Sequence, residues 1–156
     1  MNLLLKTTKE EDLNILFLNQ TDKEANRMAA FTAENPDDKA AYMEKWTKIV
    51  HNPQVNMQTI FLEGEIVGSV LHFDMMNETN VSYWIARKYW GKGIGTLALL
   101  LFLKEVKKRP LFGRTAFDNY GSQKVLQKCG FVKIGEEKGF ANARKEEIIE
   151  FVYKLN

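Results

Sequence analysis

The most informative segment of the chain is Trp90-Gly91-Lys92-Gly93-Ile94-Gly95-Thr96, in which every second residue from position 91 to 95 is glycine. It follows a β-rich segment, residues 81–85, and leads into an apolar helical segment from Ile94 to about Lys108. Glycine permits positive φ and close approach to the backbone. Unpaired amides at a helix start, together with the helix dipole, favour an anion. The segment therefore predicts a phosphate or pyrophosphate site, and a tight turn without a ligand is the alternative.

Two common nucleotide motifs fit this segment poorly. A Walker loop requires Ser or Thr after its lysine, whereas Gly93 follows Lys92. A dinucleotide fingerprint can be fitted from Gly93 to Ala98, with Asp118 at a suitable distance. The fold that carries this fingerprint begins with it and repeats βαβ units, whereas more than half of this chain precedes the segment. A nucleotide-binding domain of another kind is therefore the weaker alternative.

Strand and helix signals alternate along the rest of the chain. Hydroxyl residues, acids or a proline precede most runs with helical spacing, and turn residues separate the runs rich in β-branched and aromatic side chains. The expected strands are 3–7, 58–62, 66–73, 81–85, 111–117, 131–134 and 148–155. The expected helices begin near Thr8, Asp22, Pro36, Ile94 and Asn119. This order predicts an α/β (α+β) fold with one mixed sheet and helices on both faces, including a parallel, right-handed crossover through the helix after Ile94.

Length and composition fit a single domain over residues 1–156. Hydrophobic residues make up 45% of the chain, enough for a buried core, and the net charge is only +2. Such a balance gives little support for a nucleic-acid partner. The longest apolar run, Leu97–Leu103, is shorter than the roughly 20 residues of a membrane-spanning helix, and the first residues lack a signal-peptide pattern. We therefore expect a soluble protein with no nucleic-acid and no membrane partner.

Few residues are suited to disulfide or metal chemistry. The chain has one cysteine, Cys129, and two histidines, His51 and His72, which lack ligand spacing. An intrachain disulfide is thus excluded, and no metal site is expected. A single cysteine fits a reducing compartment, so the expected localisation is cytoplasmic.

Two blocks of the sequence, residues 82–98 and 118–135, resemble the GNAT superfamily of acetyl-coenzyme A-dependent N-acetyltransferases. The matching residues are Tyr83-Trp84-Ile85, Tyr89-Trp90-Gly91-Lys92-Gly93-Ile94-Gly95, Asn119, Ser122 and Val125-Leu126-Gln127-Lys128-Cys129-Gly130-Phe131. The Trp-Gly-x-Gly loop is typical of the branch related to ribosomal-protein alanine N-acetyltransferases. The resemblance extends over the whole chain and implies a GNAT-like, mostly antiparallel central sheet.

The resemblance also implies acetyl-coenzyme A as cosubstrate. In GNAT proteins its pyrophosphate lies on the loop amides, its pantetheine arm pairs with the fourth strand, and an Asn and a small polar residue of a later helix contact it. The residues that match these roles are Trp84, Ile85, Ala86, Trp90, Gly91, Lys92, Gly93, Ile94, Gly95, Thr96, Asn119 and Ser122. Asn119 also stands where a helix N-cap is expected, which would account for it without a ligand.

The chemistry that the resemblance implies is direct attack of an amine on the thioester. A base that neutralises the amine and an acid that protonates the departing thiolate would both assist it. Many GNAT proteins use a tyrosine as this acid, but Leu126 occupies the position here. The candidate bases are Glu78, just before the fourth strand, and Asp118, at the end of a strand beside the cleft. Their alternatives are an exposed turn residue and a helix N-terminal acid, respectively.

Together these features predict an N-acetyltransferase that moves an acetyl group from acetyl-coenzyme A to a primary amine. The acceptor would be a small molecule or a protein N-terminus. The absent tyrosine at Leu126 leaves a second interpretation open, a non-catalytic GNAT-fold module that binds an acyl-coenzyme A as sensor or partner. Related GNAT proteins are often dimers, so the resemblance also raises the expectation of a homodimer.

Overall fold

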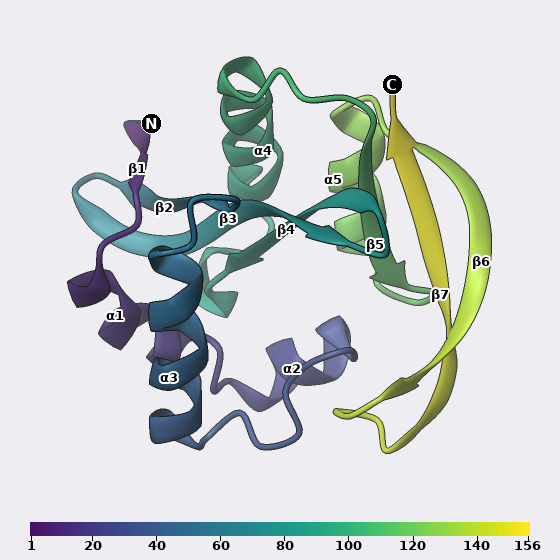
Figure 1. Ribbon diagram of the computed structural model, residues 1–156, viewed down its shortest axis with the longest axis horizontal. Coiled ribbons are helices and arrows are strands. Elements are labelled where there is room, and N and C mark those ends of the chain that lie inside the picture. The colour runs from purple at the N-terminus through teal and green to yellow at the C-terminus, as the bar shows by residue number, and fades with distance from the viewer.

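A seven-stranded sheet runs through the protein in the order β1-β2-β3-β4-β5-β7-β6 (Figure 1). The computed structural model describes all residues 1–156. The strands are β1 (Leu3–Thr7), β2 (Asn56–Leu62), β3 (Glu65–Met75), β4 (Glu78–Ile85), β5 (Leu111–Ala116), β6 (Val132–Ala141) and β7 (Glu146–Leu155). Neighbouring strands are antiparallel except β4 and β5, which are parallel. This confirms the predicted mixed, mostly antiparallel sheet.

Helices cover both faces of this sheet, as predicted (Figure 1). The α-helices are α1 (Leu13–Asn19), α2 (Lys23–Ala29), α3 (Lys39–Val50), α4 (Ile94–Glu105) and α5 (Tyr120–Lys128), and the 3-10 helices are η1 (Glu10–Asp12) and η2 (Arg87–Tyr89). α4 and α5 pack on the face that carries the larger hydrophobic cluster, and α1 and α3 pack on the opposite face. None of the helices combines the length and the apolar character that crossing a membrane requires.

The larger core is built around α4. Its residues Ile94, Ala98, Leu99, Phe102 and Leu103 are all buried. Their spacing of three and four residues places them on one helix face, which lies against the sheet within a cluster of 17 buried residues. Full burial of each large side chain in this stripe contributes about 1.5–3 kcal/mol. This packing holds the first turn of α4, and with it the preceding glycine loop, in a defined place.

The parallel strands β4 and β5 part after a single row. Asn80 and Phe112 are their one pair of register partners, whereas β3 pairs with β4 from Glu78 through Ile85. Beyond Asn80 the two strands diverge, and the chain leaves the far end of β4 toward α4 (Figure 1). The sheet therefore has an opening in its middle, beside backbone groups of β4 that β5 does not use.

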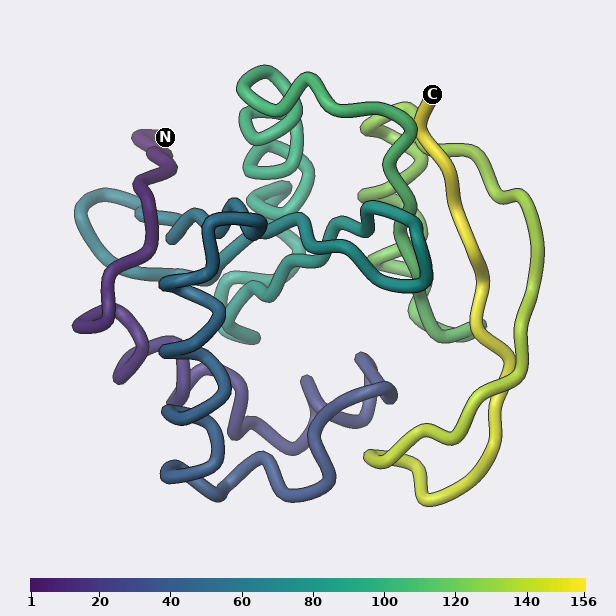
Figure 2. Tube along the Cα trace, in the orientation of Figure 1, coloured from purple at the N-terminus to yellow at the C-terminus, as the bar shows by residue number.

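The last hairpin is longer than the sequence pattern indicates. The strand expected over 131–134 extends to Ala141, because β7 pairs with it as far as Glu146. The charged residues of this segment hid the strand pattern. The hairpin reaches the segment after α2 (Figure 2). There the side-chain amide of Asn142 donates to the carbonyl oxygen of Thr32 at 2.7 Å. The N- and C-terminal halves of the molecule thus meet below the sheet opening.

Candidate active site

The loop between η2 and α4 presents a row of unpaired backbone amides. Gly91 and Gly93 have φ values of 75° and 76°, and a Cβ on either would meet nothing within 4 Å. Backbone conformation, rather than crowding, therefore requires glycine at both positions. From residue 91 onward, the first amide that donates to a backbone carbonyl is that of Leu97, 3.1 Å from the oxygen of Gly93. Residues 91–96 thus leave their N–H groups free at the N-terminus of α4, an arrangement suited to phosphate oxygens.

The start of α4 lies close against β4 and α5 because residue 95 has no side chain. A Cβ on Gly95 would lie 3.4 Å from Cγ2 of Val125 and 3.7 Å from Cε2 of Tyr83. A further contact joins the two helices, since the thiol of Cys129 donates to the carbonyl oxygen of Thr96 at 3.6 Å. Burial raises the pKa of Cys129 to about 11, so the thiol stays protonated. These contacts bring the glycine loop, β4 and α5 into one region.

The backbone of β4 faces β3 and the opening in alternation. The N–H of Ala86 donates to the carbonyl oxygen of Val67 at 2.9 Å, so Ala86 faces β3. In an antiparallel pair, residues that exchange hydrogen bonds alternate with residues whose backbone groups point away. Trp84 therefore also faces β3, whereas Tyr83 and Ile85 face the opening. Of the three residues expected to pair with a pantetheine arm, only Ile85 has the suitable orientation, and the omitted Tyr83 shares it.

Two tryptophans fix the C-terminal end of this strand. The indole of Trp90 donates to the carbonyl oxygen of Ile85 at 2.8 Å and remains 40% exposed. The indole of Trp84 points to the other face, where it donates to the carbonyl oxygen of Asn19 at 3.3 Å. Because Trp90 occupies the Ile85 carbonyl, the N–H of Ile85 and both backbone groups of Tyr83 remain as pairing groups at the opening.

The N-terminus of α5 carries both polar residues predicted there. The Asn119 side chain accepts from the Ser122 amide at 3.2 Å and caps the helix. The Ser122 hydroxyl shares a 2.7 Å hydrogen bond with the hydroxyl of Tyr83. The N-cap role of Asn119 is therefore present in the structure, and Ser122 lies at the junction of α5 with β4.

Asp118 has a structural partner that argues against its predicted role as a base. Its two carboxylate oxygens accept from the two terminal nitrogens of Arg144, each at 2.8 Å. Arg144 also donates from Nε to the carbonyl oxygen of Arg27, 2.7 Å away. The hydrogen bonds from Arg144 hold the pKa of Asp118 below its ordinary value. A carboxylate held in this way is a weak proton acceptor, and it joins the β6–β7 turn to α2 and β5.

Glu78 lies on the α1–α3 face in a cluster of carboxylates around Arg114. Arg114 lies 2.6 Å from Glu137, 3.3 Å from Glu150 and 3.8 Å from Glu78. The side chains of Arg114 and Glu150 are 15% and 19% exposed, respectively, whereas Glu137 is 57% exposed. Three carboxylates around one guanidinium give this part of the α1–α3 face a negative surface.

Glu150 is the carboxylate that the sequence interpretation missed. Burial raises its pKa, although the guanidinium of Arg114 acts in the opposite direction. A carboxylate of raised pKa is better matched to proton transfer near neutral pH than an ordinary one. A signal was present, because strand alternation puts the charged Glu150 between the apolar Ile148 and Val152 on one strand face.

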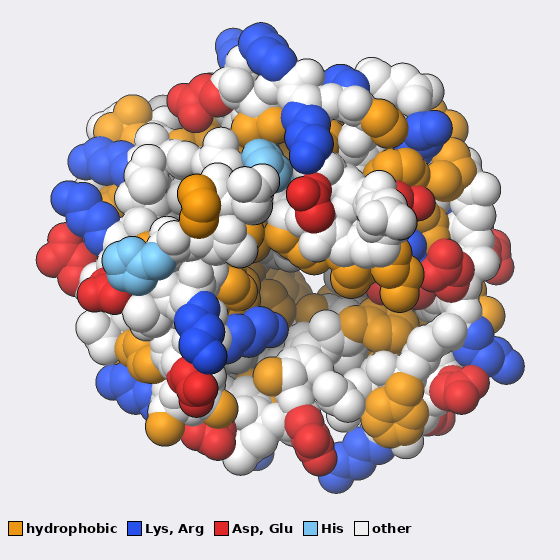
Figure 3. Space-filling model, viewed as in Figure 1, with side chains coloured by type: hydrophobic (Ala, Val, Ile, Leu, Met, Phe, Trp, Pro, Cys, Tyr) orange, Lys and Arg blue, Asp and Glu red, His pale blue; other side chains and the backbone are white.

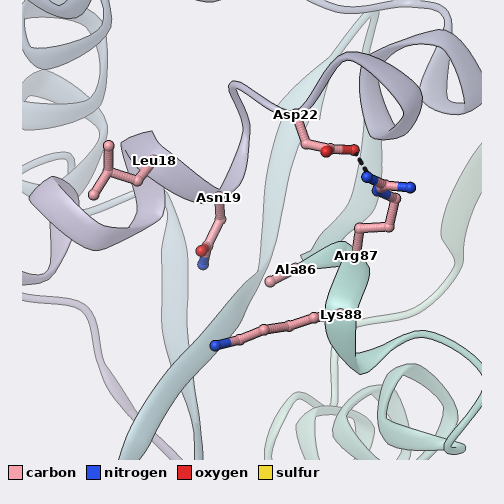
Figure 4. Close-up of a pocket in the computed structure, with 6 residues that line it drawn as sticks. All are labelled: Leu18, Asn19, Asp22, Ala86, Arg87 and Lys88. Carbon is pink, nitrogen blue, oxygen red and sulfur yellow. Dashed lines mark ion pairs between the residues drawn. The ribbon is translucent and has the colours of Figure 1, made fainter.

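The α1–α3 face is hollowed at its centre, and hydrophobic side chains line the hollow (Figure 3). A pocket of about 410 Å³ lies where the end of β4 meets the start of α2 (Figure 4). Its lining residues are Leu18, Asn19, Asp22, Ala86, Arg87 and Lys88. Nε of Arg87 lies 2.9 Å from Oδ2 of Asp22, which joins η2 to α2. No group of three or more His, Cys, Asp or Glu side chains is placed to hold a metal ion.

Comparisons with solved structures give the same fold throughout. Mycobacterium smegmatis RimJ, in complex with a coenzyme A disulfide, superposes with a TM-score of 0.80 at 16% identity, covering 98% of this chain and 81% of that one. Microcin C7 self-immunity acetyltransferase MccE, in complex with acetyl-coenzyme A and AMP, gives 0.77 at 18% identity over 98% and 91%. Spermidine N-acetyltransferase from Vibrio cholerae, in complex with coenzyme A and spermine, gives 0.77 at 16% identity over 97% and 95%.

At the level of sequence, no curated protein gives a significant match. The profile of one family, described as Acetyltransferase (GNAT) domain, matches residues 2–132. The matched range runs from β1 through α5 and includes the glycine loop and the opening between β4 and β5. The chain therefore belongs to the GNAT acetyltransferase family.

Proposed function

We propose that this protein transfers the acetyl group of acetyl-coenzyme A to a primary amine, on a small molecule or a protein N-terminus, by direct attack. One observation carries the proposal: the free amides of residues 91–96 lie at the N-terminus of α4, beside the opening between β4 and β5. A phosphate group and an extended, amide-bearing arm both find partners there. Coenzyme A combines these two features in one molecule.

In this proposal each part of the cosubstrate meets a different element. The pyrophosphate contacts the amides of residues 91–96, with Lys92 as the cation of the loop. The pantetheine arm pairs with the backbone of Tyr83 and Ile85 inside the opening. Asn119 and Ser122 contribute polar groups from the start of α5, and the Asn119 amide can do so while it caps the helix.

The acceptor amine approaches from the α1–α3 face, where the molecule is hollowed. Glu78 and Glu150 are the proposed proton acceptors, because both lie in the carboxylate cluster around Arg114 on that face. Among structurally similar proteins, one is described as an N-acetyltransferase of ribosomal protein L7/L12 and another as a spermidine N-acetyltransferase. Both kinds of acceptor, a protein N-terminus and a small amine, therefore belong in the substrate screen.

The experiment that tests the proposal has two stages. Thermal unfolding is first measured with acetyl-coenzyme A, NAD and ATP, and only acetyl-coenzyme A is expected to raise the Tm. Thiol release from acetyl-coenzyme A is then followed with a panel of amines. Stabilisation by NAD without stabilisation by acetyl-coenzyme A would contradict the proposal.

A second candidate function, a non-catalytic sensor of acyl-coenzyme A, is favoured by one observation. Leu126, at the position of the usual acid, is 2% exposed and packs against β5 at Gly113. The sensor predicts stabilisation by acetyl-coenzyme A without thiol release for any amine. The two-stage experiment therefore separates the two functions.

We propose that the enzyme is located in the cytoplasm, because its single cysteine is a buried free thiol. Neither a nucleic acid nor a membrane surface is a proposed partner, since the net charge is only +2.

A homodimer is the proposed assembly. Light scattering on the purified protein measures it directly, and a monomer at working concentration would contradict it.

A further inference from the structure

Tyr83 is a partly buried, titratable side chain that the proposed function uses only through its backbone. Its ring lies against the start of α4, since Cε2 is 3.7 Å from the Cβ position of Gly95. Its hydroxyl reaches α5, 2.7 Å from Oγ of Ser122. The phenol therefore crosses from the phosphate-binding end of α4 to α5, behind the opening between β4 and β5.

The hydroxyl of Tyr83 meets α5 one turn before Leu126. Ser122 and Leu126 are four residues apart, so they lie on the same face of the helix. Leu126 cannot donate a proton, and its Cδ2 lies 2.9 Å from the Cβ position of Gly113 on β5. The phenol of Tyr83, from β4, is thus brought to the helix face on which Leu126 stands in place of a tyrosine.

From this geometry we propose that Tyr83 is the catalytic acid of the reaction and donates its phenol proton to the sulfur of the departing coenzyme A. The inference rests on the proposed acetyl transfer. Tyr83 is one of the two β4 residues whose backbone faces the opening, so its side chain lies beside any arm that pairs there. Ser122 is the positioning residue, because its hydroxyl holds the phenol oxygen at the start of α5.

The proton balance of this step is complete. The amine nitrogen forms a bond to the carbonyl carbon, and the C–S bond breaks with its electron pair going to sulfur. The sulfur takes the proton of Tyr83. The attacking amine gives up one proton, which returns to the phenolate oxygen through the Ser122 hydroxyl and solvent. The products are an amide and a neutral thiol, and no other reactant is needed.

The surroundings of Tyr83 keep its proton in place between turnovers. Burial raises its pKa to about 12, and the hydrogen bond with Ser122 acts in the opposite direction. The phenol is therefore protonated throughout the neutral range. The nearby thiol of Cys129 is already engaged, because it donates to the carbonyl oxygen of Thr96.

The test compares Tyr83→Phe with wild type in thiol release from acetyl-coenzyme A, with hydroxylamine as the probe acceptor. Hydroxylamine is largely neutral at neutral pH, so its attack does not depend on a protein base. The expected result is a kcat reduced by about 100-fold, with the KM for acetyl-coenzyme A and the Kd for coenzyme A unchanged. The solvent deuterium isotope effect on kcat should disappear, which a purely structural role would not cause.

Two further variants complete the design. Tyr120→Phe removes an exposed phenol from the first turn of the same helix and should leave kcat unchanged. Ser122→Ala keeps the phenol but removes its partner, and its kcat should fall about fivefold, as for the loss of one hydrogen bond.

Several outcomes would overturn the inference. A wild-type kcat in Tyr83→Phe would overturn it, and so would a loss matched by weaker coenzyme A binding with the isotope effect retained. If Tyr83→Phe does not fold, an unchanged kcat in Ser122→Ala would have the same consequence. Absence of turnover in wild type with every amine would instead refute the proposed acetyl transfer, so the two failures are distinguishable.

Discussion

Single carboxylates in this protein differ in what they can do because their partners differ. Asp118 and Glu150 are both partly buried and both lie near an arginine. Arg144 binds Asp118 through two hydrogen bonds and lowers its pKa, whereas burial outweighs Arg114 at Glu150 and raises its pKa. The first group is thereby suited to holding elements together, and the second to accepting a proton.

Replacement of Asp118 by Asn should affect stability more than catalysis. Loss of the paired hydrogen bonds to Arg144 should lower the free energy of unfolding by about 2 kcal/mol at neutral pH. The folded pKa of Asp118 is below its ordinary value of 3.8, so the stabilisation is present above that value. It is lost as pH falls through the lowered folded pKa.

Urea unfolding of wild type and Asp118→Asn at a series of pH values checks this expectation. The difference between the two proteins should shrink toward zero in acid. Equal stability at neutral pH, together with loss of thiol release, would instead restore Asp118 as the base.

Glu150→Gln should lower kcat with an alkylamine acceptor by about 100-fold at neutral pH. A base must be ionised, so the wild-type rate should fall as pH drops through the folded pKa of Glu150, which lies above 4.5. This acidic limb of the pH–rate profile should vanish in the variant. Glu137→Gln is the matched control, because it removes an exposed partner of the same Arg114. Equal losses in both variants would assign the effect to Arg114 instead.

At the scale of elements, the proposed binding of coenzyme A depends on the backbone conformation of the loop before α4. Gly93→Asp should abolish coenzyme A binding, because it places a side chain and a negative charge among the amides of residues 91–96. The variant also places a non-glycine residue at a φ of 76°, which costs about 1–2 kcal/mol of stability.

Gly64→Asp separates these two effects. Gly64 lies in the β2–β3 turn at a φ of 82°, and a Cβ there would also meet nothing within 4 Å. The backbone strain should therefore be similar in both variants, whereas coenzyme A binding by calorimetry should be lost only in Gly93→Asp. Unchanged affinity in Gly93→Asp would contradict the assignment of the loop.

The elements themselves were largely predictable, because their signals are local. The glycines between residues 91 and 95 indicated a loop, and the apolar stripe that follows indicated helix α4. The alternation of Ile149, Phe151 and Tyr153 likewise indicated strand β7. β6 was underestimated, since its charged residues form a strand only through pairing with β7. Most helices and strands could therefore be predicted from local patterns, whereas the extent of β6 depends on long-range pairing.

At the scale of the whole molecule, the site depends on contacts between distant segments, which no local pattern specifies. Arg144 meets Asp118 across 26 positions, and Tyr83 meets Ser122 across 39. The sequence predicted Asn119 and Ser122 as cofactor-binding residues, which stays a prediction, whereas the phenol that reaches Ser122 became visible only in the folded chain. For the same reason, the carboxylates around Arg114 come from three separate strands.

Acetyl transfer at the glycine loop is tested by thiol release from acetyl-coenzyme A, measured with and without an amine panel for wild type and Gly93→Asp. We predict amine-dependent thiol release by wild type with at least one acceptor, an acetylated amine of matching stoichiometry by mass spectrometry, and none of this activity in Gly93→Asp. Wild-type protein that binds acetyl-coenzyme A yet releases no thiol with any amine would contradict the proposed acetyl transfer.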